Sequence, residues 1–390
     1  MQNSDTIYTD YQATTPVDPR VLARMVPFWG ESFGNPHSSD HVIGWHADSA
    51  VKDAAGSIAS MIGSDENEIV FTSGATEANN LALLGLARHD ANTRRRILVS
   101  AIEHKCVLGA ARELSMNEGI TVETVSVDGD GYLDLAELEE RIANDVLLVS
   151  VMAVNNEVGT IQDVQSICDK AKSYGALFHC DAAQAPCAMN LENLATITDL
   201  ISLSGHKMYG PQGIGALYIN RELHDRIEPL LYGGGQQDGI RSGTVPLPLC
   251  IGMAAASELI IAEGCEERNR IAHQRDMFIA LLLEAGLTIE VNGPTSDQRH
   301  PGNANIRFDG FDARDIIASL QPKLAASTGA ACSSGIPEPS HVLRAMGLTA
   351  EQSEASIRFS FGRFTSEDDI ESAANLVVIA LANLSTKNIS

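Results

Sequence analysis

Basic residues are scarce in this sequence. Its 390 residues include 27 Lys and Arg against 51 Asp and Glu, which gives a formal net charge of −24. A surface of this sign repels the phosphates of nucleic acid, so we expect no direct nucleic acid binding. The same charge favours solubility and basic protein partners. The chain is too long for a single hydrophobic core, and we expect about two domains.

Long apolar runs and paired cysteines are also missing. No segment approaches the roughly 18 uninterrupted apolar residues of a membrane-spanning helix. The first residues, MQNSDTIYTD, lack the basic and apolar parts of a signal peptide. We therefore expect a cytoplasmic protein that does not enter a membrane. The cysteines are odd in number and include no CxxC pair, which argues against a disulfide framework and against a metal site.

Short apolar segments alternate with helical segments over the first two thirds of the chain. Strands that are apolar throughout are buried on both faces, which indicates an α/β fold with a mostly parallel central sheet covered by helices. After a long helical run at 249–283, short strands and helices predict a smaller α+β domain. We expect a large domain of residues 16–260 and a small domain of residues 1–15 and 261–390. The strands of the large domain are expected at 68–72, 96–100, 122–127, 146–154, 176–180, 199–204 and 214–219.

Lys207 stands directly after one of these strands, in the sequence Ser-Gly-His-Lys. A lysine at the end of a buried strand loses hydration, which lowers its pKa. Its neutral amine is then a nucleophile for carbonyl groups. The alternative is an ordinary loop lysine, and Lys207 alone does not decide between the two.

A second polar segment follows the strand at 68–72, where Ser-Gly-Ala-Thr-Glu at 73–77 opens a helix. Free backbone N–H groups and hydroxyls at a helix N-terminus can hold a phosphate. The alternative is plain N-capping by Ser73 or Thr76.

Other polar residues also follow strand ends, where open α/β sheets place their ligand crevice. His104 is one of them, although a histidine there can equally be structural. A carboxylate, a lysine and a helix N-terminus suited to phosphate together meet the needs of pyridoxal phosphate. The remaining strand ends carry Asn155, Asp181 to Gln184, and Ser204.

Several segments together resemble the cysteine desulfurases of the class V aminotransferase-like family, and the similarity extends from about residue 7 to 380. The resemblance implies the type I fold of pyridoxal phosphate enzymes, with the cofactor bound at Lys207, and a homodimer. The segments are SGATEANN at 73–80, IEHK at 102–105, NNEVGT at 155–160, HCDAAQ at 179–184, SGHKMYGPQGIGALY at 204–218 and RSGT at 241–244.

The resemblance also implies a set of contacts with pyridoxal 5'-phosphate and with the substrate. Asp181 would face the ring nitrogen and Gln184 the ring hydroxyl, while His104 would stack on the ring and move protons together with Lys207. Arg358 would bind the substrate carboxylate, since a guanidinium fits a carboxylate bidentately. The phosphate contacts would come from Ala75, Thr76, Ser204 and His206, and from Thr244 of the partner subunit; Asn155 would contact cofactor and substrate, and Asn35 would complete the substrate site.

Cys332 lies in a segment of small residues, STGAACSSGIPEPS at 327–340. Its glycines and prolines predict a mobile loop of the small domain. A cysteine among such residues is accessible, and an accessible thiolate is reactive. The alternative is a small residue that fills a turn. The segment resembles the longer catalytic loop, ACxSxxxEPS, of one desulfurase branch.

The implied reaction converts L-cysteine to L-alanine. The sulfur forms a persulfide on Cys332 and passes to a sulfur-acceptor or scaffold protein of iron–sulfur cluster assembly or nucleic-acid thiolation. A selenocysteine lyase, an aminotransferase of the same fold and a non-catalytic scaffold are the alternatives. The Cys332 segment argues against an aminotransferase, and the intact site residues argue against a scaffold.

The sequence departs from the family pattern at a few places. Gln212 stands where lysine is common, and Gln237-Asp238 stands where Glu-Arg is common. The spacing of the segment 35–41, NPHSSDH, is also unusual. We expect these departures to affect the neighbourhood of the site and the partner surface, and to leave the chemistry unchanged.

Overall fold

A seven-stranded mixed sheet forms the centre of the molecule, in the strand order β2-β8-β7-β6-β5-β3-β4. The computed structural model describes residues 6–295, 297–328 and 339–387. Only β8 is antiparallel to its neighbours, which confirms the predicted α/β class with a mostly parallel sheet. The strands are β2 (Ile69–Thr72), β3 (Arg96–Ser100), β4 (Thr121–Val125), β5 (Val146–Ser150), β6 (Leu177–Asp181), β7 (Leu200–Ser204) and β8 (Gly215–Ile219).

Helices cover both faces of this sheet, because successive strand residues point to opposite sides. On β3, Leu98 packs into one core, whereas Ile97 and Val99 pack into the other. The first core is completed by α1 (Pro19–Met25), α3 (Val42–Ile62), α7 (Leu135–Arg141), α8 (Val164–Ser173) and α9 (Leu194–Ile197). The second is completed by α4 (Ala75–Asn80), the π-helical turn Leu81–Gly85, α5 (Leu86–Arg88) and α6 (Lys105–Asn117).

A smaller antiparallel sheet, in the order β12-β10-β9, lies beside the large one. It has its own core, which includes Phe278, Phe359 and Phe361. The strand β1 (Ile7–Tyr8) pairs in parallel with β11 (Leu324–Ala325) in a separate two-stranded sheet, and Ile7 packs against the core of the small sheet. The other elements are β9 (Glu290–Val291), β10 (Asn303–Arg307), β12 (Ser356–Ser360), α11 (Ala313–Leu320), α12 (His341–Ala345), α13 (Ala350–Glu354) and α14 (Glu367–Lys387).

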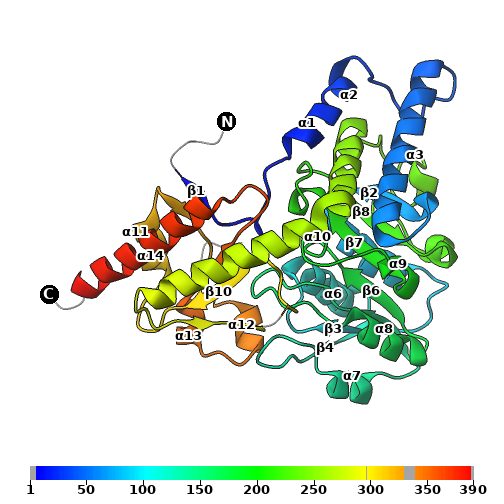
Figure 1. Ribbon diagram of the computed structural model, residues 1–390. Helices are drawn as coiled ribbons and strands as arrows, with labels where there is room; N and C mark the ends of the chain where they lie inside the picture. Colours follow the sequence, from blue (N-terminus) through cyan, green and yellow to red (C-terminus); the bar gives the residue numbers. More distant parts are fainter. Residues whose placement is uncertain (1–5, 296, 329–338, 388–390) are drawn as a thin grey trace.

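Helix α10 (Leu247–Glu284) connects the two parts without a break and passes the expected domain boundary at residue 260 (Figure 1). Its first half belongs to the core of the large sheet and its second half to the core of the small one. By length and composition alone α10 could cross a membrane. Its packing against α1, α3 and α14 accounts for the apolar residues as those of a core helix.

The predicted elements differ from the structure mainly at their ends. The apolar run 146–154 leaves the sheet after Ser150, and Val154 pairs with Ile161 in a single bridge. The strands β1 and β11 were not predicted, because each has two residues and exists only through its pairing with the other.

Candidate active site

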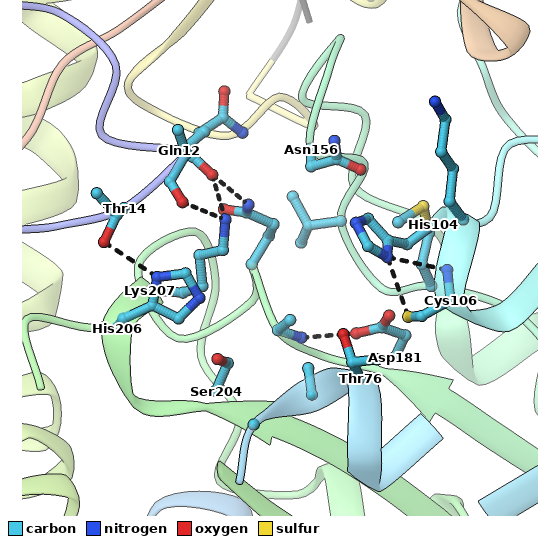
Figure 2. A pocket seen from close by; sticks show the side chains of 18 of the residues that line it. Gln12, Thr14, Thr76, His104, Cys106, Asn156, Asp181, Ser204, His206 and Lys207 are labelled. Carbon is cyan, nitrogen blue, oxygen red and sulfur yellow. Dashed lines mark hydrogen bonds between the residues drawn. The ribbon is translucent and has the colours of Figure 1, made fainter. Parts of the chain in front are cut away.

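A cavity of about 700 Å³ opens where the carboxyl ends of the large-sheet strands meet the small sheet. Helix α4 and the end of β7 contribute Thr76 and Ser204 (Figure 2), and β12 contributes Arg358. Most of the residues predicted to form the site line this cavity: Ala75, Thr76, His104, Asp181, Gln184, Ser204, His206, Lys207 and Arg358.

Lys207 ends the 3₁₀ turn Gly205–Lys207 that follows β7. Its Nζ donates to the carbonyl oxygens of Gln12, at 2.5 Å, and Ala13, at 2.8 Å. Burial, assisted by the positive charge of Arg358, lowers the pKa of this amine to about 8. The amine is therefore far easier to deprotonate than an exposed lysine, as predicted from its place after a buried strand.

Asp181 is the last residue of β6 and is buried. One carboxylate oxygen, Oδ1, accepts from the backbone N of Ala183 at 3.0 Å. The other, Oδ2, accepts from Asn79 Nδ2 at 2.7 Å. These bonds hold the carboxylate in one orientation at the floor of the cavity.

His104 is the N-cap of α6, and its ring lies against the first turn of that helix. Its Nδ1 accepts from the backbone N of Cys106 at 3.2 Å and lies 2.9 Å from Cys106 Sγ. Burial lowers the pKa of His104. Figure 2 shows the ring side away from Cys106 turned into the cavity.

The phosphate side of the expected site contains Ser204, His206 and the start of α4. His206 Nδ1 lies 3.0 Å from Thr14 Oγ1, and burial with the nearby Lys207 charge lowers the pKa of His206 to about 4. Gly74, which caps α4 and lines the cavity, would meet no heavy atom within 4 Å if it carried a Cβ. The backbone at this helix start is therefore open to a ligand.

Arg358 is almost completely buried on β12. Its guanidinium donates to Asp10 Oδ1 at 2.6 Å and to the carbonyl oxygen of Asn156 at 2.7 Å. Its buried Nε has no hydrogen-bond partner among the residues that the structure describes. An unpaired buried donor of this kind is costly. The charge of Arg358, which lines the cavity, suits a carboxylate there.

Some predicted residues do not reach the cavity. The fully buried Asn155 accepts from the backbone N of Glu157 and Val158 and donates to the carbonyl oxygen of Ile102, so its amide holds a turn. Asn156, the next residue, lines the cavity instead.

Asn35 and Thr244 are both exposed, and neither lines the cavity. Asn35 Oδ1 accepts from the backbone N of His37. Cys332 lies outside the described residues.

Several lining residues were not predicted. Gln12 and Thr14 come from the N-terminal segment, where no pattern in the sequence marks them. Cys106 stands two residues after His104 at the start of a helix, and this position could have indicated that the two residues meet.

Of the departures from the family pattern, Gln212 lines the cavity and donates to Thr14 Oγ1 at 3.3 Å. Gln237 bonds both the backbone N and O of Phe71, on the edge strand β2.

The chain matches the family model described as aminotransferase class-V over residues 7–372. It belongs to this family. It is 44% identical over 371 residues to the cysteine desulfurase IscS of Rickettsia bellii (strain OSU 85-389), covering 95% of this chain and 90% of that protein. Its fold is similar to that of a NifS-like protein, with a TM-score of 0.89 and 34% identity over 97% of this chain and 99% of the other. It is also similar to SspA in complex with cysteine, with a TM-score of 0.79 and 33% identity over 93% of this chain and 100% of the other.

As a class-V enzyme the protein depends on pyridoxal phosphate, and the cavity fits this group. The amine of Lys207, the buried carboxylate of Asp181 and the open backbone at Gly74 supply a nucleophile, a partner for a protonated ring nitrogen and donors for a phosphate. Arg358 adds a guanidinium to the cavity wall, fixed in place by Asp10 and the carbonyl oxygen of Asn156, and a carboxylate suits such a charge.

Proposed function

We propose that this class-V enzyme is a cysteine desulfurase, which converts L-cysteine to L-alanine and passes the sulfur to an acceptor protein through a persulfide on Cys332. The observation that carries this proposal is the cavity itself. It contains a lysine amine with a pKa of about 8, a buried aspartate and a buried arginine with an unpaired Nε. The 44% identity with the cysteine desulfurase IscS of Rickettsia bellii supports the choice of substrate.

The cofactor contacts follow the positions of the lining residues. Pyridoxal 5'-phosphate, once bound, supplies an aldehyde for an amine and a ring that withdraws electrons from an attached amino acid. Lys207 would hold it through Nζ, Asp181 would bind the ring nitrogen and Gln184 the ring hydroxyl. Ala75, Thr76, Ser204 and His206 would hold the phosphate, together with Thr244 from the partner subunit.

The substrate is oriented by its carboxylate. Arg358 binds that carboxylate with its guanidinium, whose orientation is fixed by the bonds to Asp10 and to the carbonyl oxygen of Asn156. Asn156 takes the place beside the substrate that the sequence assigned to Asn155, whose amide is already used. Asn35 lies outside the cavity of its own chain, and its predicted contact with the substrate stays a prediction.

Proton transfers are carried by Lys207 and His104. Lys207 Nζ accepts a proton from Cα of the substrate, because its lowered pKa leaves part of the amine neutral near pH 8. His104 acts on the cavity side through the ring nitrogen that is not bound at Cys106. Lys207 needs to be neutral to accept this proton, whereas the ring nitrogen of His104 that is not bound at Cys106 carries the hydrogen of the neutral ring and presents it to the cavity.

Sulfur transfer is the part that Cys332 performs. Its thiolate attacks the substrate sulfur; the new S–S bond forms as the C–S bond breaks, and the electron pair stays on the carbon that becomes the methyl group of alanine after protonation. The first and last residues of the segment 327–340 bond to residues that line the cavity. Ser327 pairs with the backbone of Arg358, and Ser340 donates to Glu157 Oε2 at 2.5 Å.

A homodimer completes the proposal. Large apolar side chains are exposed together on α1, α2 (Pro27–Gly30) and the start of α3, and a second copy of the chain would cover them. We call this the α1–α3 surface; it consists of Leu22, Val26, Trp29, Phe33, Val42, Ile43 and Trp45, with exposed fractions of 45–65%. A cytoplasmic location fits the acidic composition and the core position of α10.

The test is alanine formation from L-cysteine by the loaded enzyme, together with mass spectrometry of the protein. We expect alanine and a gain of one sulfur on the peptide that contains Cys332. Cys332→Ser should abolish both, whereas Cys265→Ser, the same change at an exposed cysteine, should abolish neither. Turnover by Cys332→Ser at the wild-type rate would overturn the persulfide step. Turnover of selenocysteine but not of cysteine would favour the alternative, a selenocysteine lyase.

Transfer of labelled sulfur to candidate carrier proteins would then identify the acceptor. A scaffold of iron–sulfur cluster assembly is the acceptor that we propose first, because the similar proteins include a cysteine desulfurase IscS. Labelling of a nucleic-acid thiolation carrier and not of such a scaffold would overturn this choice without affecting the desulfurase reaction.

A further inference from the structure

Asp181 and His104 are connected by a chain of side chains that the reaction described above does not use. Asn79, fully buried on α4, donates through Nδ2 to Asp181 Oδ2 at 2.7 Å and to Cys106 Sγ at 3.1 Å. Cys106 Sγ in turn lies 2.9 Å from His104 Nδ1. The chain therefore joins the carboxylate at the floor of the cavity to the histidine at its side. Figure 2 shows its two ends, Asp181 and His104, and the contact of His104 with Cys106.

The number of hydrogens that each group carries determines which atoms donate and which accept in this chain of hydrogen bonds. An amide Nδ2 carries two hydrogens and can only donate, so Cys106 Sγ accepts from Asn79. The thiol has one hydrogen, and burial together with the charge of Asp181 raises its pKa to about 12, so the hydrogen is retained. Thr76 also hydrogen-bonds to Cys106 and, because it favours the thiolate, acts as a donor to Sγ; the thiol hydrogen is therefore available for His104 Nδ1.

His104 Nδ1 also accepts from the backbone N of Cys106 at 3.2 Å. A nitrogen that accepts hydrogen bonds cannot carry a proton itself, so a neutral ring carries its proton on Nε2. The ring side that holds Nε2 is the one turned into the cavity in Figure 2.

We propose that Cys106 is a positioning residue, which holds His104 as the neutral Nε2–H tautomer and, through Asn79, connects its orientation to that of Asp181. The hydrogen-bond chain exists in the protein alone, and only its catalytic consequence rests on the proposed function. Cys106 does not touch the substrate in this proposal and acts through His104.

Other groups around His104 act on the same ring. Lys207 from the turn after β7, His341 from α12 and Lys105 from α6 disfavour the imidazolium, whereas Asp181 from β6 favours it. Burial, the largest of these effects, also disfavours the imidazolium and so lowers the pKa of His104. Removal of the thiol donor should raise the pKa of His104, because a bond that the neutral ring accepts is lost.

The experiment uses nitrogen-15 NMR of histidine-labelled protein without cofactor, for wild type, Cys106→Ala and Cys106→Ser. His104→Gln assigns the signal among the 11 histidines. We expect the wild-type ring to carry its proton on Nε2. In Cys106→Ala the pKa of His104 should rise by about half a unit to one unit, the effect of one neutral hydrogen bond, and the Nδ1–H tautomer should become populated. Serine can donate the same bond, so Cys106→Ser should stay near wild type.

Several results would overturn the proposal. The proton on Nδ1 in the wild-type protein would do so without any variant, which protects the test against a variant that fails to fold. Equal titration of His104 in wild type and Cys106→Ala would do so as well. Equal shifts in Cys106→Ala and Cys106→Ser would assign the effect to packing.

The loaded enzyme provides a second readout. The acidic limb of the kcat profile should move to higher pH in Cys106→Ala by the same amount as the pKa of His104, since only the neutral ring accepts from Cys106 at Nδ1 and so keeps Nε2–H turned into the cavity. An unmoved acidic limb would overturn the catalytic consequence. Absence of alanine formation by the wild type would refute the proposed function, while the NMR result would still decide the role of Cys106.

Discussion

Arg358 Nη2 donates to Asp10 Oδ1 over 2.6 Å, and this ion pair attaches the strand β12 to the N-terminal segment at the wall of the cavity. Burial raises the pKa of Asp10, and the guanidinium opposes this shift. The pair fixes the orientation of the guanidinium before any ligand arrives.

Arg358→Lys should weaken the substrate site. A lysine has no planar fork and cannot keep the bonds to Asp10 and Asn156 while it binds a carboxylate. We expect kcat/KM for L-cysteine to fall roughly 10- to 100-fold, mainly through KM, as for the loss of one charged hydrogen bond. Arg307→Lys, the same change on β10 outside the cavity, is the control. An unchanged KM in Arg358→Lys would contradict the assignment.

Lys207 should capture the cofactor in a pH-dependent manner. Only the neutral amine attacks an aldehyde, and the pKa of Lys207 is lowered to about 8. The rate at which cofactor-free protein takes up pyridoxal phosphate should therefore rise with pH and reach half its maximum near pH 8, measured by absorbance. Lys207→Arg should abolish covalent capture, whereas Lys170→Arg on α8 should not. A midpoint near that of an exposed lysine would contradict the effect of burial.

Gly215 lies where β8 passes the start of α4. A Cβ there would come within 2.5 Å of the carbonyl oxygen of Leu203 and 2.6 Å of Gly74 Cα. Gly215→Ala should displace the backbone at Gly74 and weaken cofactor binding at least tenfold, measured by equilibrium titration. Gly109→Ala on α6, where a Cβ meets nothing within 4 Å, should leave binding unchanged and slightly stabilise the helix. Equal affinity of Gly215→Ala and wild type would show that this contact is not needed.

The α1–α3 surface should govern the oligomeric state. Trp29→Glu combined with Trp45→Glu places charges among the exposed apolar side chains, where a second copy would have to bury them. We expect the apparent mass in sedimentation to fall from dimer to monomer. Ile379→Glu on α14, at the opposite end of the molecule in Figure 1, is the control. A dimer that persists in the double variant would mean that another surface holds the copies together.

The sequence predicts this fold well where apolar strands are buried on both faces. The bounds of β3 were predicted to the residue, because every position from Arg96 to Ser100 lies in the sheet. The run 146–154 was predicted too long, since β5 ends at Ser150, although the buried Val151 and Ala153 still donate backbone hydrogen bonds to His179 and Asp181 of β6. Hydrophobicity reports burial and cannot distinguish a buried strand from a buried turn.

The sequence is equally limited in predicting which single side chains line the cavity. Asn155 and Asn156 are identical in type, and only the backbone decides that the first holds a turn while the second lines the cavity. Gln12 and Thr14 reach the cavity because the N-terminal segment is anchored by β1 beside β11, a pairing of residues more than 300 positions apart that no local pattern encodes.

The continuous helix α10 couples the unfolding of the two cores. One α-helix of 38 residues supplies side chains to the cores of both sheets, so neither core can unfold without exposing part of this helix. Heating should therefore give a single cooperative calorimetric transition rather than one for each sheet.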